Sequence, residues 1–370
     1  MIRVAAAMSG GVDSSVAALL VKESGQPVVG LSMQLYDRSR DGGPTYGRCC
    51  SSRDLQDARA AADRIGIPYY VLNFEEEFKR EVVEDFVSEY KSGRTPVPCV
   101  HCNSGPKFRH LLERAAALGA GRVATGHYAR LADDPRTGRL RLMRARDLTK
   151  DQSYFLFTLT QQQLARALFP LGDLSKKEVR ALAASRGLPN ADKPESQDLC
   201  FVPDGRYADF IRRESGDAGG AGEIVDGTGR VLGRHSGLAG FTIGQRRGLG
   251  LASSRPLYVV GLDARRNRVT VGEDREQYRS VLLAARACWV SIAEPRSPFT
   301  AIARIRSSHA GAEARVEPLP GARFRVAFGE AQRAVTPGQA VVLYDGDVLL
   351  GGGFIAEVPG QEDLRTPGAD

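Results

Sequence analysis

The stretch IRVAAAMSGGVDSSVAALLVK, residues 2–22, decides the fold of this chain. Its apolar run over residues 2–8 is typical of a strand that is buried on both faces. Residues 14–22 have a helical pattern, and only a short turn separates them from the strand. A buried strand that leads directly into a helix predicts an α/β fold built on a parallel sheet.

The turn itself, SGGVDSS at 9–15, has the residues of an anion site. Gly10 and Gly11 let the backbone approach a phosphate, and the N–H groups at the start of the following helix favour negative charge. Ser14 adds a hydroxyl donor, and Asp13 is placed to help hold Mg²⁺. The turn is neither a Walker loop nor G-x-G-x-x-G. The alternative is a plain connection in which Asp and Ser only cap the helix.

Further strands and helices alternate through the first half of the chain. We expect strands at 28–33, 69–72 and 123–125, and helices at 55–65, 74–90 and 108–118. A helical pattern covers 161–186, with a capping box at Ser175 and Glu178 and a stop at Gly187. Ligands of such sheets bind at the carboxyl ends of the strands.

The pattern changes after about residue 204, where helical periods nearly vanish. Short apolar alternations separated by Gly and Asp predict a β-barrel or sandwich, with strands expected at 223–225, 258–262, 268–271, 301–305, 324–328 and 340–344. The glycine-rich stretch 215–222 is expected to be a surface loop, and the tail from residue 359 to be disordered.

Charge and composition narrow the class of protein. The 370 residues carry a net charge of +7, and residues 230–268 hold eight Arg against one acid. Such basicity attracts a nucleic acid or an anionic membrane surface, although solvated basic faces would give the same count. With no signal peptide and no apolar run of membrane-spanning length, we expect a cytoplasmic protein whose six cysteines stay reduced.

Two sets of cysteines stand out. Cys102, in the run Cys99-Val-His-Cys102, precedes an expected helix, and Cys200 lies in the segment SQDLCF. A thiolate is a nucleophile, and two thiols distant in sequence can meet across a cleft, one as a persulfide and the other as its disulfide partner. Cys288 is expected to be buried and inert, and the Cys49–Cys50 pair to be structural.

Taken in order, these motifs resemble those of bacterial tRNA-specific 2-thiouridylases of the N-type ATP pyrophosphatase (PP-loop) superfamily. The matching segments are SGGVDSS (9–15), CCSSRDLQDAR (49–59), RTPVPCVHCN (94–103), KF (107–108), TGHYAR (125–130), KDQSYFL (150–156), SQDLCF (196–201), GQRRGLGL (244–251) and PGQ (337–339). The resemblance implies a Rossmann-like PP-loop catalytic domain over 1–204, a central tRNA-binding domain over 205–278 and a C-terminal β-barrel over 279–360, before a disordered tail over 361–370.

The resemblance also implies a reaction. ATP, with Mg²⁺, activates the C2 oxygen of the wobble uridine of tRNA for Lys, Glu and Gln as an adenylate, with release of pyrophosphate. A persulfide on Cys200 then delivers sulfur, AMP leaves, and Cys102 completes the transfer through a disulfide. The implied partners are tRNA and a sulfur donor, which is a cysteine desulfurase or a persulfide relay protein.

Site residues follow by position. The resemblance implies catalytic roles for Cys102 and Cys200, nucleotide contacts at Ala7, Met8, Ser9, Gly10, Gly11, Val12, Asp13, Ser14, Met33 and Gly126, and tRNA contacts at Val97, Pro98, Cys99, His127, Lys150, Asp151, Gln152, Arg306, Ser307 and Gln339. For His127 the alternative is a hydrogen-bonded structural histidine. Arg246 and Arg247 are tRNA candidates from charge alone.

Position 99 departs from the family pattern, in which Asp is common. With Cys99, Cys102 and Cys200 the chain has three thiols for one site, and these would also suit a [4Fe-4S] cluster with one open iron. Val97 replaces a common Asn, so contacts with the base are expected to differ. Two other readings stay open: another adenylating PP-loop synthetase or amidotransferase, and a non-catalytic RNA-binding or sulfur-carrier protein.

Overall fold

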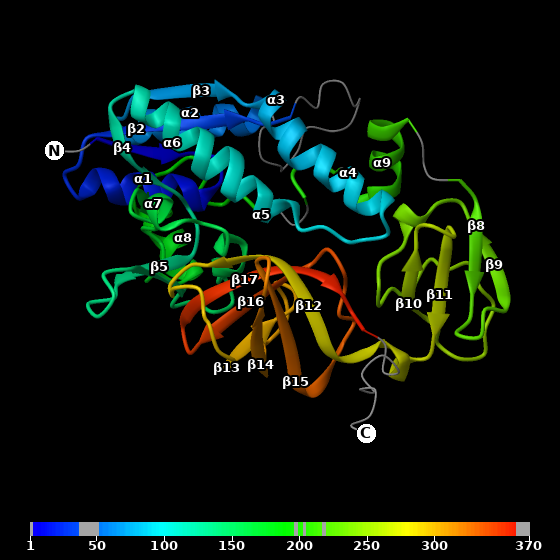
Figure 1. Cartoon of the computed structure of the whole chain (residues 1–370). Coiled ribbons are helices and arrows are strands. Elements are labelled where there is room, and N and C mark those ends of the chain that lie inside the picture. Colours follow the sequence, from blue (N-terminus) through cyan, green and yellow to red (C-terminus); the bar gives the residue numbers. More distant parts are fainter. Residues whose placement is uncertain (1–2, 37–51, 196–198, 203–204, 217–219, 360–370) are drawn as a thin grey trace.

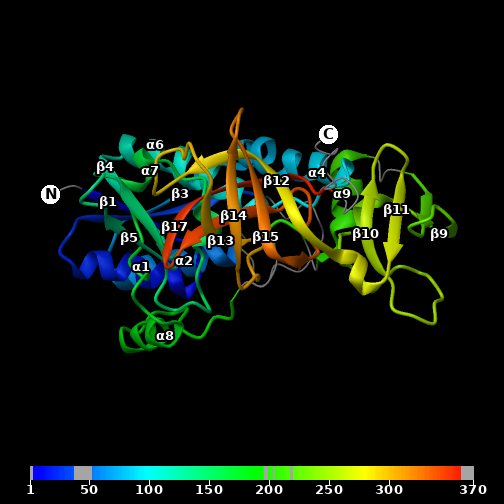
Figure 2. The same cartoon turned by 60° about the horizontal axis from the view of Figure 1, so that its bottom comes forward.

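A computed structural model of the chain describes residues 3–36, 52–195, 199–202, 205–216 and 220–359. Three bodies follow one another along the chain (Figure 1). A helix-covered parallel sheet comes first, a small four-stranded sheet second and a barrel last. The turned view shows the barrel strands between the first domain and the small sheet (Figure 2).

The first domain is built on five parallel strands. Their order is β3 (Tyr69–Asn73), β2 (Val28–Gln34), β1 (Arg3–Ala7), β4 (Ala120–Ala124) and β7 (Ala167–Leu168). Alternate residues of β1 face opposite sides, since Val4 packs with α1 (Val12–Glu23) and α2 (Ser52–Ile65), whereas Ala5 joins the core on the other face. The α/β fold with a parallel sheet, predicted from residues 2–22, is confirmed.

The opposite face is covered by two longer helical segments with wide turns inside them. The first runs through α3 (Glu75–Phe78), a π-helical stretch η2 (Lys79–Val83) and α4 (Glu84–Lys91). The second runs through α5 (Pro98–Cys102), π-helical η3 (Asn103–His110) and α6 (Leu111–Ala117). The predicted start at residue 108 is therefore wrong. Pro98 opens the helix because its fixed φ suits the first turn, and Pro106 is accommodated by the wider π turn.

The predicted helical stretch 161–186 is interrupted. It divides into α7 (Gln161–Leu164), the short strand β7 and α8 (Lys176–Ser185), and follows the single turn η4 (Ser153–Leu156). The start of α8 is as predicted, because Ser175 and Glu178 form a capping box. Local periodicity cannot show that residues 167–168 add an edge strand beside β4.

The C-terminal sheet closes on itself as a six-stranded barrel. Strand β12 (Tyr278–Trp289) pairs with both β15 (Arg323–Arg333) and β17 (Val348–Glu357), and the ring is completed by β14 (Ala312–Leu319), β13 (Phe299–Arg304) and β16 (Ala340–Asp345). Its interior holds a separate apolar core around Phe324 and Leu343. The short alternations predicted a barrel or a sandwich, and the closed ring confirms the barrel that the family resemblance implied.

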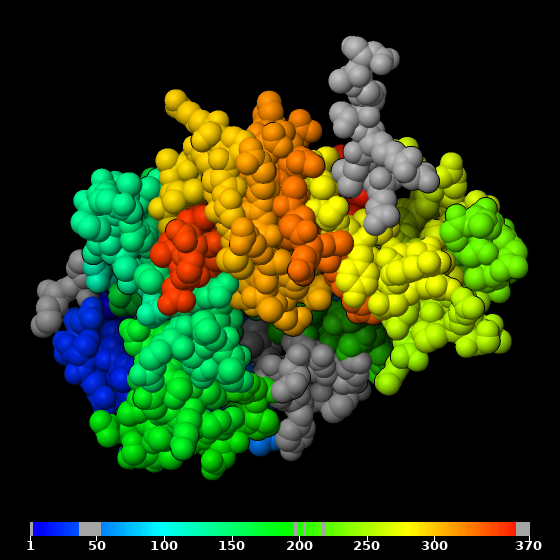
Figure 3. Space-filling model, turned by 90° about the horizontal axis from the view of Figure 1, so that it is seen from below, coloured from blue at the N-terminus to red at the C-terminus, as the bar shows by residue number. Residues whose placement is uncertain are grey.

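A hairpin from the first domain extends this barrel. Strands β5 (Ala129–Asp133) and β6 (Leu140–Arg144) pair with each other, and Leu142 and Met143 of β6 pair with β17. Seen from below, the blue-green surface of the hairpin region lies against the red surface of the β17 region (Figure 3). The hairpin was not predicted, although it joins the first domain to the barrel.

The central body has strand order β10 (Tyr258–Asp263), β11 (Arg268–Gly272), β8 (Gly222–Val225) and β9 (Val231–His235), with the short turns η6 (Leu238–Gly240) and η7 (Asp274–Gln277). It is preceded by α9 (Tyr207–Ser215), so the expectation that helices end near residue 204 is wrong. Phe210 of α9 makes edge-to-face contacts with Phe86 and Phe201, which fixes this helix on the first domain.

The cap of α8 gives a first prediction. Ser175→Ala removes the hydroxyl that accepts a hydrogen bond from the Glu178 N–H. Loss of this cap should lower the stability of the helix by about 1 kcal/mol. Amides in the first turn of α8 should exchange with solvent about five-fold faster, measured by native-state hydrogen exchange. Ser185→Ala, at the other end of α8, is the control, and equal protection in the two variants would contradict the assignment.

Candidate functional site

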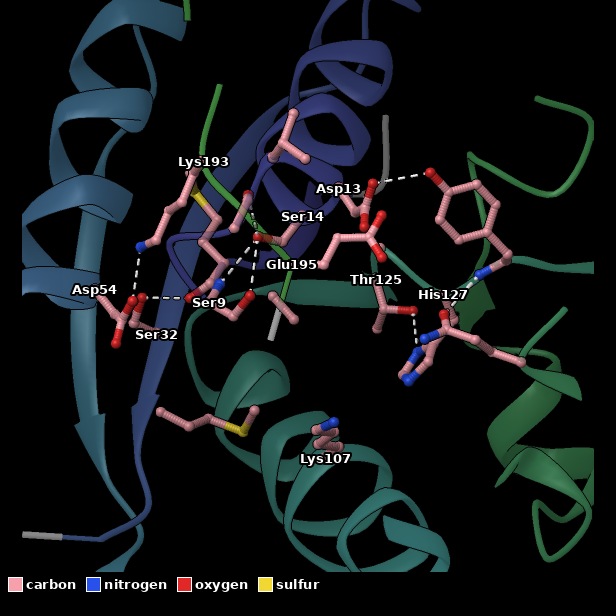
Figure 4. Close-up of a pocket in the computed structure, with 18 of the residues that line it drawn as sticks. Ser9, Asp13, Ser14, Ser32, Asp54, Lys107, Thr125, His127, Lys193 and Glu195 are labelled. Carbon is pink, nitrogen blue, oxygen red and sulfur yellow. Dashed lines mark hydrogen bonds and ion pairs between the residues drawn. The ribbon is translucent and has the colours of Figure 1, made fainter. Parts of the chain in front are cut away.

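A pocket opens at the carboxyl ends of the parallel strands. Its walls come from the segments after β1 and β4, from Ser32 and Met33 of β2, and from the chain on either side of Lys193, and it encloses about 320 Å³ (Figure 4). This is the edge at which an α/β sheet binds ligands. Of the ten nucleotide residues implied by the resemblance, nine line the pocket: Ala7, Met8, Ser9, Gly11, Val12, Asp13, Ser14, Met33 and Gly126.

The tenth, Gly10, shapes the turn from behind. Its φ is +76°, and a Cβ there would lie 2.2 Å from the carbonyl oxygen of Asp54. Only glycine satisfies both conditions. Asn190 donates from Nδ2 to the Gly10 carbonyl (3.0 Å) and to Ser15 Oγ (2.9 Å), which ties the turn to the chain after α8.

Hydroxyl groups hold the turn ready for an anion. The Ser9 N–H donates to Ser14 Oγ (3.1 Å), and Ser14 Oγ donates to the Gly11 carbonyl (3.0 Å). Helix α1 begins at Val12, so its free N–H groups and its dipole face the same cavity. The arrangement suits a phosphate chain.

Gly126 brings the end of β4 against the phosphate turn. A Cβ at this position would lie 2.7 Å from the Ser14 nitrogen and 2.9 Å from the Asp13 carbonyl carbon. Any other residue must therefore push the turn away from the sheet. This explains why glycine follows β4 at this position.

Lysines and carboxylates alternate across the pocket. Lys176 Nζ lies 2.7 Å from Asp13 Oδ1 and 3.1 Å from Glu195, and Lys150 Nζ lies 2.7 Å from the other oxygen of Glu195. The hydrogen bond from Lys150 lowers the pKa of Glu195, although burial opposes it. All four side chains line the cavity, so a polyphosphate that enters would compete with the carboxylates for the lysines.

A third lysine lies at the back of the turn. Lys193 Nζ donates to Asp54 (2.6 Å), to Asp57 (2.5 Å) and to the Gly10 carbonyl (3.2 Å). Burial by itself would lower the pKa of Lys193, but the bonds to the two aspartates outweigh it and raise the pKa. Sequence reasoning gave none of Lys107, Lys176 and Lys193 a place in the pocket. Lys107 appeared only in the KF motif and Lys176 only within a capped helix, and Lys193 belongs to no motif.

His127 lines the pocket with an uncharged imidazole ring. Its Nδ1 lies 2.9 Å from Thr125 Oγ1, and its ring contacts those of Phe108 and Phe169. Burial, with a smaller effect of Lys107, lowers the pKa of His127 to about 3. These contacts match the structural alternative for His127, and the side chain also faces the cavity.

The cysteines lie in a neighbouring region. Cys99 is exposed and Cys102 is buried on α5, and the partly buried Cys200 packs against the same apolar core as Cys102. Neither Cys102 nor Cys200 lines the nucleotide cavity. In the described part of the chain, no three His, Cys, Asp or Glu side chains are close enough to hold a metal ion, so the three thiols do not form a cluster site in this conformation.

The remaining cysteines are Cys288 and the Cys49–Cys50 pair. Cys288 on β12 is partly buried, and burial raises the pKa of its thiol, as an inert cysteine requires. Cys49 and Cys50 lie outside the described residues, as does the segment Ser196–Asp198 before Leu199.

The residues expected to contact tRNA lie in the pocket, at the start of α5, in the barrel and in the central body. Lys150, Gln152 and His127 line the nucleotide pocket, and Val97 and Pro98 are buried at the start of α5. Gln339 of the barrel donates to the Thr95 carbonyl (3.2 Å), directly before α5. The Asp151 side chain is 2% exposed and pairs with Arg304 of the barrel. Arg306 donates to the Arg333 carbonyl. Ser307, Arg246 and Arg247 are exposed.

Three protein-family models together match most of the chain. A tRNA methyl transferase HUP domain matches residues 2–204, a tRNA methyl transferase PRC-barrel domain 208–273, and an aminomethyltransferase β-barrel domain 279–355. In the part of the chain that the coordinates describe, no helix is both long and apolar enough to cross a membrane.

Curated relatives match over almost their full length. The tRNA-specific 2-thiouridylase MnmA of Geotalea uraniireducens is 53% identical over 95% of this chain and 94% of its own. The proteins of the same name from Geobacter metallireducens and Solibacter usitatus are 52% and 51% identical, over 95% of this chain and 96% and 98% of theirs.

The approach of Gly126 to the phosphate turn leads to a second prediction. Gly126→Ala places a methyl group 2.7 Å from the Ser14 nitrogen, so the turn must shift, and ATP affinity should fall about ten-fold in equilibrium binding. Gly329→Ala, where a Cβ meets nothing within 4 Å, is the control. Unchanged affinity in Gly126→Ala would contradict this role.

A third prediction concerns protonation of His127. Because burial depresses its pKa to about 3, the imidazole should stay neutral from pH 8 to pH 5. Its ring proton signal in NMR, assigned with His127→Gln, should show no midpoint in that range. The unfolded chain takes up a proton below pH 6.5 and the folded chain does not, so His127 stabilises the fold above pH 6.5 and progressively less as pH falls toward 3. A midpoint near 6.5 would refute the assignment.

Proposed function

This chain belongs to the family of tRNA-specific 2-thiouridylases, and we propose that it uses ATP to replace the C2 oxygen of the wobble uridine of tRNA by sulfur. The relatives at about 50% identity along the full chain carry this proposal. The glycine turn and its lysines supply a place for the triphosphate. The substrates are the tRNAs for Lys, Glu and Gln.

Activation by ATP answers a chemical difficulty. The C2 oxygen of uracil is a poor leaving group, and its attack on the α-phosphate of ATP makes it part of AMP, which leaves readily. Pyrophosphate departs in the first step, and Lys176 and Lys150 are placed to stabilise its charge. The target base has to leave the anticodon stack, which is cheaper in a single-stranded loop than in a duplex.

Sulfur enters in the second step. The terminal sulfur of a persulfide on Cys200 attacks C2, and AMP leaves with the former C2 oxygen. The thiolate of Cys102 then attacks Cys200 Sγ, so that the S–S bond of the persulfide breaks, a Cys102–Cys200 disulfide forms and the thiocarbonyl remains on the base. An external thiol reductant restores the two thiols. The packing of both cysteines against one apolar core supports their meeting.

The segment Ser196–Asp198 and its neighbours connect the two regions of the site. Glu195 lines the nucleotide pocket, and Cys200 follows it after four residues. Five residues of extended chain span at most about 18 Å, which bounds the Cα–Cα distance from Glu195 at the pocket wall to Cys200. A cysteine desulfurase or a persulfide relay protein loads Cys200.

The reaction needs few protein ligands for Mg²⁺. Mg²⁺ bound with ATP would take its ligands mainly from phosphate oxygens and water, with Asp13 as the nearest carboxylate of the turn, since the described residues offer no set of three ligands. For the same reason we assign no iron–sulfur cluster to Cys99, Cys102 and Cys200. Cys99 is exposed on α5.

A fourth prediction tests the persulfide. Cys200→Ser should abolish 2-thiouridine formation, measured by mass analysis of tRNA nucleosides after incubation with ATP, L-cysteine and a cysteine desulfurase, and should leave tRNA binding and tRNA-dependent ATP–pyrophosphate exchange intact. Cys288→Ser is the matched control and should retain activity.

Other outcomes separate the rival functions. Normal thiolation by Cys200→Ser would overturn the persulfide assignment. An ammonia-using synthetase would keep full activity in both Cys102→Ser and Cys200→Ser. A non-catalytic RNA-binding protein would show no pyrophosphate exchange at all.

A further inference from the structure

Arg304, at the end of barrel strand β13, is buried where the barrel meets the first domain. Its Nη1 lies 3.0 Å from Asp151 Oδ2, with the two side chains 12% and 2% exposed. Burying such a pair costs desolvation of both charges, so stability alone is a weak reason for it. Its geometry points to a role in positioning.

The same guanidinium also holds a barrel loop. Nε donates to the His309 carbonyl (2.9 Å), and Nη2 donates to the Ser307 carbonyl. Ser307 and Ser308 are exposed at the tip of this loop. One side chain thus ties the backbone of residues 305–309, on the outside of the molecule, to a carboxylate inside it.

From Asp151 the contacts continue to the phosphate turn. Asp151 Oδ1 accepts from the Ser153 N–H (3.1 Å), which fixes the bend that carries Gln152. Gln152 Oε1 accepts from the Tyr128 N–H (3.0 Å), and the Gln152 N–H donates to the Tyr128 carbonyl (2.9 Å). The Tyr128 hydroxyl donates to Asp13 Oδ1 (2.8 Å), within the glycine turn.

This path ends at a group of alternating lysines and carboxylates. Asp13 is held by Tyr128 and Lys176, and Lys176 in turn contacts Glu195, which also binds Lys150. Lysines paired with carboxylates leave the phosphate site unfilled by cations, whereas lysines turned toward a triphosphate complete it. A small displacement of residues 150–152 changes the pairing of lysines with carboxylates directly, because Lys150 is the neighbour of Asp151 in the chain and also pairs with Glu195.

We propose that Arg304 is a positioning residue that makes ATP use depend on tRNA docking. The inference rests on the proposed function. Phosphates of the tRNA that contact loop 305–309 shift the Arg304–Asp151 pair, which moves Lys150 and Gln152 and releases the lysines toward ATP. Adenylation then occurs only when a tRNA is in place, which prevents idle ATP hydrolysis.

The test is tRNA-stimulated ATP–pyrophosphate exchange in the full-length protein. In Arg304→Gln, affinities for tRNA and for ATP alone should stay within about three-fold of wild type, while the stimulation of exchange by saturating tRNA falls at least about ten-fold. Arg325→Gln is the matched control, a barrel arginine that pairs with Glu317. Full stimulation in Arg304→Gln would overturn the coupling.

A double-mutant cycle separates positioning from general damage. Asp151→Asn keeps the shape of the side chain and should show the same loss of stimulation, and the double variant should lose no more than either single one. Additive losses would overturn the proposal. No exchange in wild type with tRNA would overturn the proposed function together with this inference.

Discussion

Close approach of two backbones at the phosphate turn is the constraint on which the site depends. Gly10 lies against the Asp54 carbonyl and Gly126 against the Ser14 nitrogen, at distances that no Cβ allows. These contacts fix the turn between α2 and the end of β4. Once the turn is fixed, the start of α1, the serine hydroxyls and the pocket lysines face one cavity.

The barrel and the catalytic domain are joined too closely to act as independent modules. The hairpin β5–β6 leaves the first domain and pairs with β17, Gln339 bonds the segment before the cysteine helix, and Arg304 reaches Asp151. A polyanion bound across the barrel would thus touch elements that hold both the nucleotide pocket and α5. This connection explains how a charge-rich RNA surface, a nucleotide and a sulfur atom can be handled by one chain.

Local signals predicted the elements that are defined by their own residues. The strand–turn–helix at 2–22, the cap at Ser175 and three of the six barrel strands, β13, β15 and β16, were readable, since burial patterns and caps are written into short stretches. Barrel strands β12, β14 and β17 were not predicted. The start of α5, the interruption at β7 and helix α9 were missed. In each case a proline, a short edge strand or a nearby glycine-rich loop outweighed the local pattern, and tertiary packing decided the outcome.

By itself the sequence determined the family, the glycine turn and nine residues that line the pocket, because these depend on residue types in a fixed local order. Only the tertiary structure decided which cations meet in the pocket, that Asp151 is buried against an arginine about 150 residues away along the chain, and that His127 is held neutral. Charge partners and pKa values depend on distances through space and on exclusion of water, and neither is encoded in any short stretch of the chain.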